Sequence, residues 1–147
     1  DEEGQILGSH QGVHRFTIGQ RRGLGIASGD RRFVADIDAG EQKVVLAPKD
    51  ALKCSLVKVS EFKFLVPQNV WPKNITVKIR ARSKAESAQV LSCDENTMQI
   101  KFDEPALGVA LGQAAVVYDG DVMLGGGLLS GRLDGAFPRQ VSQQNLL

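Results

Sequence analysis

The sequence lacks the segments that would place it in or across a membrane. Its 147 residues contain no apolar run that approaches the roughly 20 residues needed to span a bilayer. The chain opens with DEEG, where a signal peptide would carry a basic segment followed by an apolar one. We therefore expect a cytoplasmic protein with no membrane partner.

Cysteine and histidine are scarce. Cys54 and Cys93 lie far apart and form no CxxC pair, so a disulfide scaffold is excluded and no zinc site is indicated. No basic or histidine-rich segment beside them favours a thiolate, and we expect two reduced structural thiols. His10 and His14 have a spacing that pairs ligands only on a helix, and Gly12 argues against one there. We expect no bound metal.

A sustained helical period is also missing, and alternation of apolar and polar residues takes its place. In ITVKIRAR (75–82) the apolar side chains fall on one face and Lys78, Arg80 and Arg82 on the other. The segments RFVADID (32–38) and MQIKF (98–102) alternate in the same way, with Phe33 and Ala35 sharing a face. Turn residues separate the strands at 38–41, 93–96 and 118–121, and PKDAL (48–52) suits one helical turn. The sequence predicts a nearly all-β chain with one or two small barrels or sandwiches.

The chain is expected to divide into three parts, with a seam near residues 52–68. We predict a small β domain over 1–55, a β-barrel over 56–133 and a polar tail over 134–147, partly disordered or docked through Phe137 and the terminal leucines. Residues 1–92 carry 15 Lys and Arg against 10 Asp and Glu, whereas residues 93–147 carry 3 against 7. This asymmetry fits a polar partner on one side, and ordinary charge scatter explains it equally well.

Glycine is plentiful and gathers with arginine in HQGVHRFTIGQRRGLGIASG (10–29), where the glycines give backbone freedom and Arg21 and Arg22 give charge. GLGIASG misses the GxGxxG spacing by one residue and precedes a strand-like segment, so it does not predict a dinucleotide site. The glycines of LGGGLL (124–129) predict close backbone packing or a bulge in a barrel. No P-loop and no GxSxG motif is present, and no residue is singled out for catalysis.

The remaining candidate for function is the basic face of Lys78, Arg80 and Arg82. Alternate residues of a strand lie about 7 Å apart, which resembles the spacing of phosphates along a nucleic acid backbone. Two interpretations stay open on the residues alone: a nucleic-acid-binding face, or a solvated strand face.

Three blocks, in order, resemble the motifs of the tRNA-specific 2-thiouridylases. The block GSHQGVHRFTIGQRRGLGIA (8–27) resembles the family signature G-x-H-x-G…T-I-G-Q-R-x-G-L-G-I. KIRAR (78–82) is similar to its K-x-R-Y-R segment, and FDEPALGVALGQAAVVYDGDVMLGGGLL (102–129) to its F-x-E-P…P-G-Q-x-A-V-x-Y block. The resemblance covers about residues 4–130.

This resemblance implies an all-β fold, with a small SH3-like central β domain followed by a translation-factor-like β-barrel. In the family, an N-terminal ATP-pyrophosphatase domain adenylates the wobble uridine of certain tRNAs, and a persulfide sulfur then displaces AMP. The SGGxDS loop and the catalytic cysteines of that chemistry do not occur in this sequence. The resemblance therefore implies a fragment without catalytic residues or a cofactor of its own. Its partners would be tRNA and the missing N-terminal domain, with ATP and a sulfur-donor protein serving the parent enzyme.

The resemblance also assigns candidate site residues. The tRNA-contacting pair of the K-x-R-Y-R segment falls on Arg80 and Ala81, and the glutamine of the P-G-Q motif falls on Gln113. Ala81 replaces the usual aromatic residue, so any contact there would come from the backbone.

Lys78 and Arg82 flank this pair on the basic face, and Arg21 and Arg22 belong to the family's GQRRGLG loop, where they would contact RNA or the neighbouring domain. We interpret the chain as the tRNA-binding part of a tRNA-specific 2-thiouridylase. The alternative is a stand-alone β-barrel adaptor that binds protein.

Overall fold

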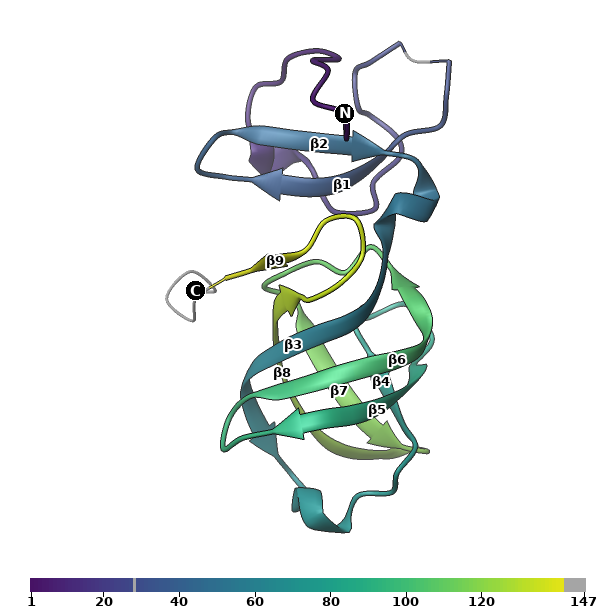
Figure 1. The fold of residues 1–147 in the computed structure, drawn as a ribbon, viewed down its shortest axis with the longest axis vertical. Coiled ribbons are helices and arrows are strands. Elements are labelled where there is room, and N and C mark those ends of the chain that lie inside the picture. The colour runs from purple at the N-terminus through teal and green to yellow at the C-terminus, as the bar shows by residue number, and fades with distance from the viewer. Residues whose placement is uncertain (28, 142–147) are drawn as a thin grey trace.

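The computed structural model describes residues 1–27 and 29–141 and confirms the all-β class (Figure 1). A small sheet pairs β1 (Phe33–Asp38) with β2 (Lys43–Ala47). A larger sheet contains β3 (Lys53–Phe64), β4 (Ile75–Lys78), β5 (Glu86–Cys93), β6 (Met98–Leu107), β7 (Ala114–Asp119), β8 (Val122–Arg132) and β9 (Arg139–Gln140). The helical turns are 3-10: η1 (Val13–Arg15), η2 (Lys49–Leu52) and η3 (Gln68–Val70). None of the helical turns in these described ranges has the length and hydrophobicity that crossing a membrane requires.

The larger sheet closes into a six-stranded antiparallel barrel, because β3 pairs with β6 on one side and with β8 on the other. The strand order around the barrel is β3-β6-β5-β4-β7-β8, and β9 extends the sheet beyond β8. Alternate side chains fill the interior, as the sequence pattern predicted for residues 75–78 and 98–102. The fully buried interior side chains include Val57, Val59, Val77, Met98, Ile100, Phe102, Val117 and Leu129.

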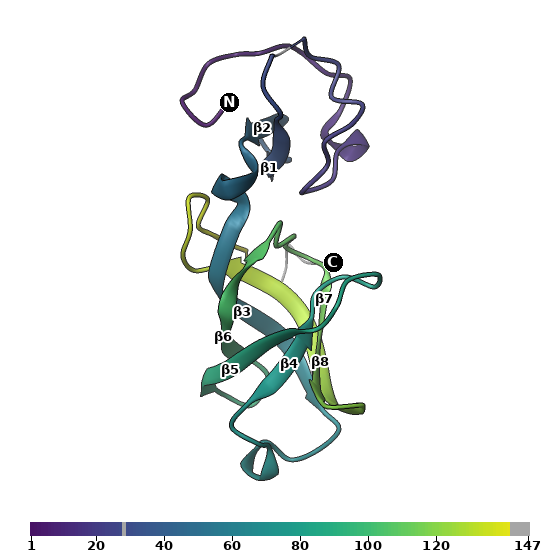
Figure 2. The ribbon, with the colours of Figure 1, turned by 90° about the vertical axis from the view of Figure 1, so that its right-hand side faces the viewer.

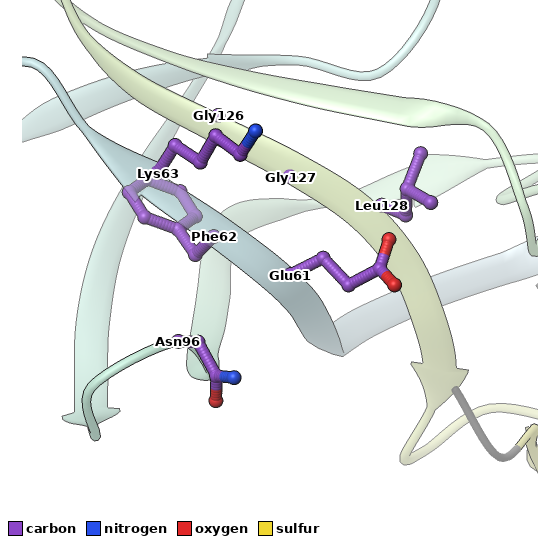
Figure 3. Close-up of a pocket in the computed structure, with 7 residues that line it drawn as sticks. All are labelled: Glu61, Phe62, Lys63, Asn96, Gly126, Gly127 and Leu128. Carbon is purple, nitrogen blue, oxygen red and sulfur yellow. The ribbon is translucent and has the colours of Figure 1, made fainter. Parts of the chain in front are cut away.

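The glycine run of β8 allows the barrel to close. A Cβ on Gly127 would lie 2.5 Å from the carbonyl oxygen of Ser60, and a Cβ on Gly125 would lie 2.6 Å from that of Lys63. The register of β3 against β8 shifts between Ser60 and Lys63, and Glu61 within this bulge has a φ of 52°. Figure 3 shows the residues that line the hollow over this bulge, among them Glu61 and Lys63 of β3 and Gly126 and Gly127 of β8. The sequence prediction of close packing or a bulge at residues 124–129 is confirmed in both respects.

The small sheet sits at one end of the barrel and has a core of its own (Figure 1). Ala35, Ala47 and Leu52 form this core, and the half-buried Phe137 packs against it. The predicted alternation within residues 32–38 is only partly correct. A register shift between residues 34 and 36 places Val34 and Ala35, which are neighbours in sequence, both inside. The helical turn predicted over residues 48–52 is present as η2.

One further expectation, the extent of the strand that carries the basic residues, needs correction. The strand predicted over residues 75–82 ends at Lys78, so Arg80 and Arg82 lie in the turn that follows and do not continue a basic strand face. Within the segment predicted as a tail, Phe137 packs against the core of the small sheet and Arg139 lies in β9. The terminal leucines lie outside the described residues. The domain division over 1–55, 56–133 and 134–147 stays a prediction; β3 runs through residues 55 and 56.

Candidate nucleic-acid interface

Arg80 lies just beyond the end of β4, where the barrel meets the small sheet. Its Nη2 donates hydrogen bonds to the carbonyl oxygens of Gly108 at 2.5 Å and of Leu107 at 3.2 Å. The residue as a whole stays exposed, and its Nε and Nη1 donate to no other described residue. Arg80 therefore braces the end of β6 while its Nε and Nη1 stay unpaired among the described residues.

Two glycines make room for the Arg80 guanidinium. A Cβ on Gly108 would overlap Nη2, and a Cβ on Gly19 would lie 3.2 Å from it. Both residues have a positive φ, +65° and +86°, so glycine is favoured there by backbone conformation as well as by space. The N–H of Gly19 also donates to the carbonyl of Val34 in β1 at 2.8 Å. The glycine loop, by which we mean residues 19–25 (GQRRGLG), thus contacts both β1 and the Arg80 side chain.

The other residues predicted from the K-x-R-Y-R and P-G-Q motifs surround this point. Lys78, half-buried, pairs with Val116, so the end of β4 and the start of β7 lie at the same end of the barrel. Ala81 and Arg82 are exposed in the turn after β4, and Gln113 is exposed in the turn before β7. Figure 2 shows the β4–β5 loop projecting from the barrel end that faces β1 and β2. Segments far apart in sequence therefore present Lys78, Arg80, Arg82 and Gln113 at one end.

Arg21 and Arg22 occupy the turn of the glycine loop beside this barrel end. The Gln20 side chain braces the turn: its Oε1 accepts from the Thr17 N–H at 3.0 Å, and its Nε2 donates to the Arg22 carbonyl at 2.8 Å. Both arginine side chains are exposed, and neither guanidinium is hydrogen-bonded or ion-paired to another described residue. Both guanidinium groups are therefore available to bind an anion.

A cluster of ion pairs, which we call the clasp, holds the small sheet against the barrel. Asp36 of β1 accepts from Arg132 of β8 at 2.5 Å and pairs with Arg139 of β9 at 3.0 Å. Arg132 is buried, with 6% of its side chain exposed, and it also donates to the carbonyl of Val109 at 3.2 Å. Arg139 pairs with Asp38 at 3.3 Å as well. Sequence reasoning missed the clasp because its partners lie about a hundred residues apart in an otherwise unpatterned segment.

The thiol of Cys54 is buried at the start of β3, where Asp134 holds the chain. Oδ1 of Asp134 accepts from the N–H groups of Ser55 and Leu56 at 2.8 Å and 2.9 Å, and from the Cys54 thiol at 3.2 Å. Burial, reinforced by the Asp134 carboxylate, raises the pKa of Cys54 to about 11. Burial and the neighbouring Asp94 also raise the pKa of Cys93. Neither thiol has the environment of a reactive cysteine.

Alkylation of the native chain should therefore be slow at the Cys54 thiol. At pH 8 we expect Cys54 to react with iodoacetamide at least a hundredfold more slowly than a free thiol, because with a pKa near 11 only about one thiol in a thousand is ionised. Its rate should rise roughly tenfold per pH unit up to pH 10. Mass spectrometry of the native chain measures both sites, and the denatured chain, in which both should react alike, is the control. Fast labelling of native Cys54 at pH 8 would contradict this account.

His10 and His14 lie in the glycine-rich segment without a ligand set around them. Nδ1 of His10 accepts from the Gly12 N–H at 3.1 Å, and its ring packs edge-on against Phe16 at 5.2 Å between centroids. Across residues 1–27 and 29–141, no three His, Cys, Asp or Glu side chains come together in a metal-binding group. His10 serves to shape the turn that enters the glycine loop.

Models of known protein families match the chain in two segments, which correspond to its two sheets. Residues 54–129, over half of the chain, match the model of the aminomethyltransferase beta-barrel domain, and residues 1–48 match that of the tRNA methyl transferase PRC-barrel domain. Relatives that the chain resembles are named tRNA-specific 2-thiouridylase MnmA. The chain belongs to the tRNA-specific 2-thiouridylase family. The resemblance of the three motif blocks is thereby confirmed.

Among the 2-thiouridylases, the protein of Acaryochloris marina is 41% identical over 136 residues, which is 88% of this chain and 38% of that protein. The Aquifex aeolicus protein is 40% identical over 126 residues, 86% of this chain and 35% of that protein. The Clostridium acetobutylicum protein is 37% identical over 130 residues, 88% and 37% respectively. The chain thus spans little more than a third of the length of these relatives.

Proposed function

We propose that this chain is the tRNA-binding part of a tRNA-specific 2-thiouridylase, and that the barrel end around Arg80 is its RNA contact surface. The observation that carries the proposal is the gathering of Lys78, Arg80, Arg82 and Gln113 at one end of the barrel, with donors that the described residues leave unpaired. Guanidinium and ammonium groups on an exposed surface supply the contacts that most protein–RNA affinity needs.

In the whole enzyme, ATP and a sulfur-donor protein would serve the N-terminal ATP-pyrophosphatase domain, which activates the wobble uridine for 2-thiolation. The present chain would hold the tRNA, and no residue in it is proposed to act on the uridine. Ala81 would offer the RNA only its backbone. Arg21 and Arg22 would contact RNA or that N-terminal domain.

Arg80 and Arg82 lie in a turn and not on a strand face, and this position determines which donors each side chain can offer to RNA. Arg80 uses Nη2 to hold the end of β6 and offers its remaining donors to a phosphate, whereas Arg82 is not bonded to the described residues and acts by charge. Gln113 can donate its side-chain amide to a phosphate or a base edge.

Replacing Arg80 by alanine should weaken tRNA binding by about tenfold, since a charge-assisted hydrogen bond to phosphate contributes about 1.5–3 kcal/mol before solvent competition. Gln113→Ala should cost less. The salt dependence of binding should flatten by about one counterion for Arg80→Ala and not for Gln113→Ala. Titration of a tRNA transcript against the 147-residue chain at several salt concentrations measures both effects.

The matched control is Lys73→Ala, which removes one exposed positive charge from the loop between η3 and β4. Melting curves check folding, because Arg80→Ala also loses the bonds to Gly108 and Leu107, at a cost of about 1 kcal/mol. Arg80→Lys keeps the charge and should recover part of the affinity. Equal tRNA affinity for wild type, Arg80→Ala and Lys73→Ala at low salt would overturn the proposal.

The adaptor alternative rests on a different surface. Leu65, Val122 and Met123 are exposed by 66%, 58% and 44%, and the N–H of Leu65 donates to the carbonyl of Leu124 beside them. Exposed apolar side chains of this kind occur where proteins dock. If the chain binds no tRNA at low salt, the adaptor alternative is favoured and this apolar surface becomes the candidate binding site.

A further inference from the structure

A hollow of about 330 Å³ lies beside the glycine loop, and Arg22 does not line it. Its lining, here called the arginine hollow, consists of Arg21, residues 23–26, Asp30, Arg31 and Arg32. Three arginines and one aspartate give these side chains a formal charge of +2. Its volume is at the lower end of the range for sites that hold small ligands, and it exceeds what a single water or metal ion needs.

The hollow is rich in hydrogen-bond donors without acceptors. The guanidinium groups of Arg21 and Arg31 make no hydrogen bond or ion pair with another residue that the structure describes. The backbone N–H groups of residues 23–26 likewise donate to none of these residues. Since unpaired backbone N–H groups are normally satisfied by solvent or by a ligand, this concentration of donors favours an anion.

The backbone of the loop has a conformation that is common in concave groups of N–H donors. Gly23 and Gly25 both have a positive φ, +72° and +69°, and nothing lies within 4 Å of the position of a Cβ on Gly25. Neighbouring residues that alternate with left-handed ones form concave groups of N–H donors, which bind phosphates in many proteins. The glycines here are not explained by packing, unlike those of β8.

Arg32 also lines the hollow, and an ion pair holds its guanidinium in place. Its Nη1 bonds to Glu2 at 2.6 Å, and 19% of its side chain is exposed. Its Nε is buried without an acceptor. The ion pair with Glu2 fixes the guanidinium before any ligand binds, and its Nε remains a donor without an acceptor.

We infer that the arginine hollow is a phosphate-binding site, in which Arg21, Arg31 and the N–H groups of residues 23–26 hold the phosphate oxygens. Planar guanidinium groups and backbone N–H groups are the donors that proteins combine for phosphate. The phosphate would come from the RNA backbone or from a small phosphorylated molecule. The RNA source rests on the function proposed above, and the site itself does not.

Inorganic phosphate is the first probe. In ¹⁵N–¹H spectra of the 147-residue chain, phosphate should shift the amide signals of Gly23 and Gly25 along a saturating curve, and chloride at equal ionic strength should not. Arg21→Ala/Arg31→Ala should abolish the saturation. Both side chains are exposed and make no contacts that folding needs, so the variant is expected to melt with the wild type. Absence of a saturating shift in the wild-type glycine amides would overturn the site.

A tRNA transcript is the second probe, and Arg22→Ala is the matched comparison, because Arg22 is adjacent and equally charged but does not line the hollow. With an RNA source, Arg21→Ala should lose about tenfold in affinity and Arg22→Ala about threefold or less. Saturable phosphate shifts combined with equal tRNA affinities of Arg21→Ala and wild type would retain the phosphate site and reject the RNA source. A wild-type chain that binds no tRNA fails the proposed function separately from the site.

Discussion

Replacing Gly127 by alanine should destabilise the barrel more than any single substitution on its surface. A Cβ there would lie 2.5 Å from the carbonyl oxygen of Ser60 and 2.8 Å from Cγ1 of Val59, both in β3. These neighbours are not free to move, since Ser60 and Val59 are buried and pair with Leu128 and Leu129. Overpacking usually costs 1–3 kcal/mol, and a clash with backbone lies at the upper end, so we expect a loss of about 3 kcal/mol or more.

For a barrel of this size, such a loss lowers the melting temperature by more than about 10 °C. Circular dichroism melts of the 147-residue chain measure it. Gly29→Ala is the control, because nothing lies within 4 Å of its Cβ position and its φ is not positive. Gly126→Ala, with its nearest backbone atom at 3.0 Å, should fall between the two. A Gly127→Ala chain that melts with Gly29→Ala would show that β3 and β8 are not packed as described.

The barrel was predictable because its signal is local. Alternation at residues 75–78 and 98–102 places Ile75, Val77 and Ile100 inside, and the structure confirms it. The turn residues at 93–96 and 118–121 lie between paired strands, β5 with β6 and β7 with β8. Local patterns of this kind depend only on which face of a strand meets the core.

The sequence pattern and the family motifs named the candidate residues, but they could not give the geometry of these residues. Alternation continues through Ile79, which is buried, and so it suggested a strand that carried Arg80 and Arg82. The strand ends at Lys78, and beyond it the Arg80 side chain bonds to the carbonyl groups of Leu107 and Gly108. No pattern in the sequence indicates which carbonyl group a distant arginine will meet.

The clasp escaped prediction for the same reason, and it determines how the candidate site is assembled. Gly19 bonds to Val34 of β1, and Asp36 of the same strand is held by Arg132 and Arg139 of the barrel. The position of the glycine loop relative to Arg80 therefore depends on ion pairs between segments about a hundred residues apart.

Asp36→Ala should consequently destabilise the chain far more than the loss of a surface aspartate. It leaves Arg132, only 6% exposed, without its carboxylate partner, and its Nε already lacks an acceptor. Removing one member of a buried ion pair costs about 3–5 kcal/mol, because a charge stays buried and uncompensated. Asp50→Ala, which removes an 89% exposed carboxylate paired with Lys53, should cost less than about 1 kcal/mol.

Urea unfolding followed by tryptophan fluorescence reports on the barrel, since Trp71 packs against its core. The double variant Asp36→Leu/Arg132→Met removes both charges, and it should recover much of the stability that Asp36→Ala loses. The glycine amide signals should shift in Asp36→Ala and stay in place in Asp50→Ala, because only the first releases β1 from the barrel. If Asp36→Ala unfolds at the same urea concentration as Asp50→Ala, the clasp does not hold the small sheet, and the alignment of the glycine loop with Arg80 must come from the contacts of Gly19 and Gly108 alone.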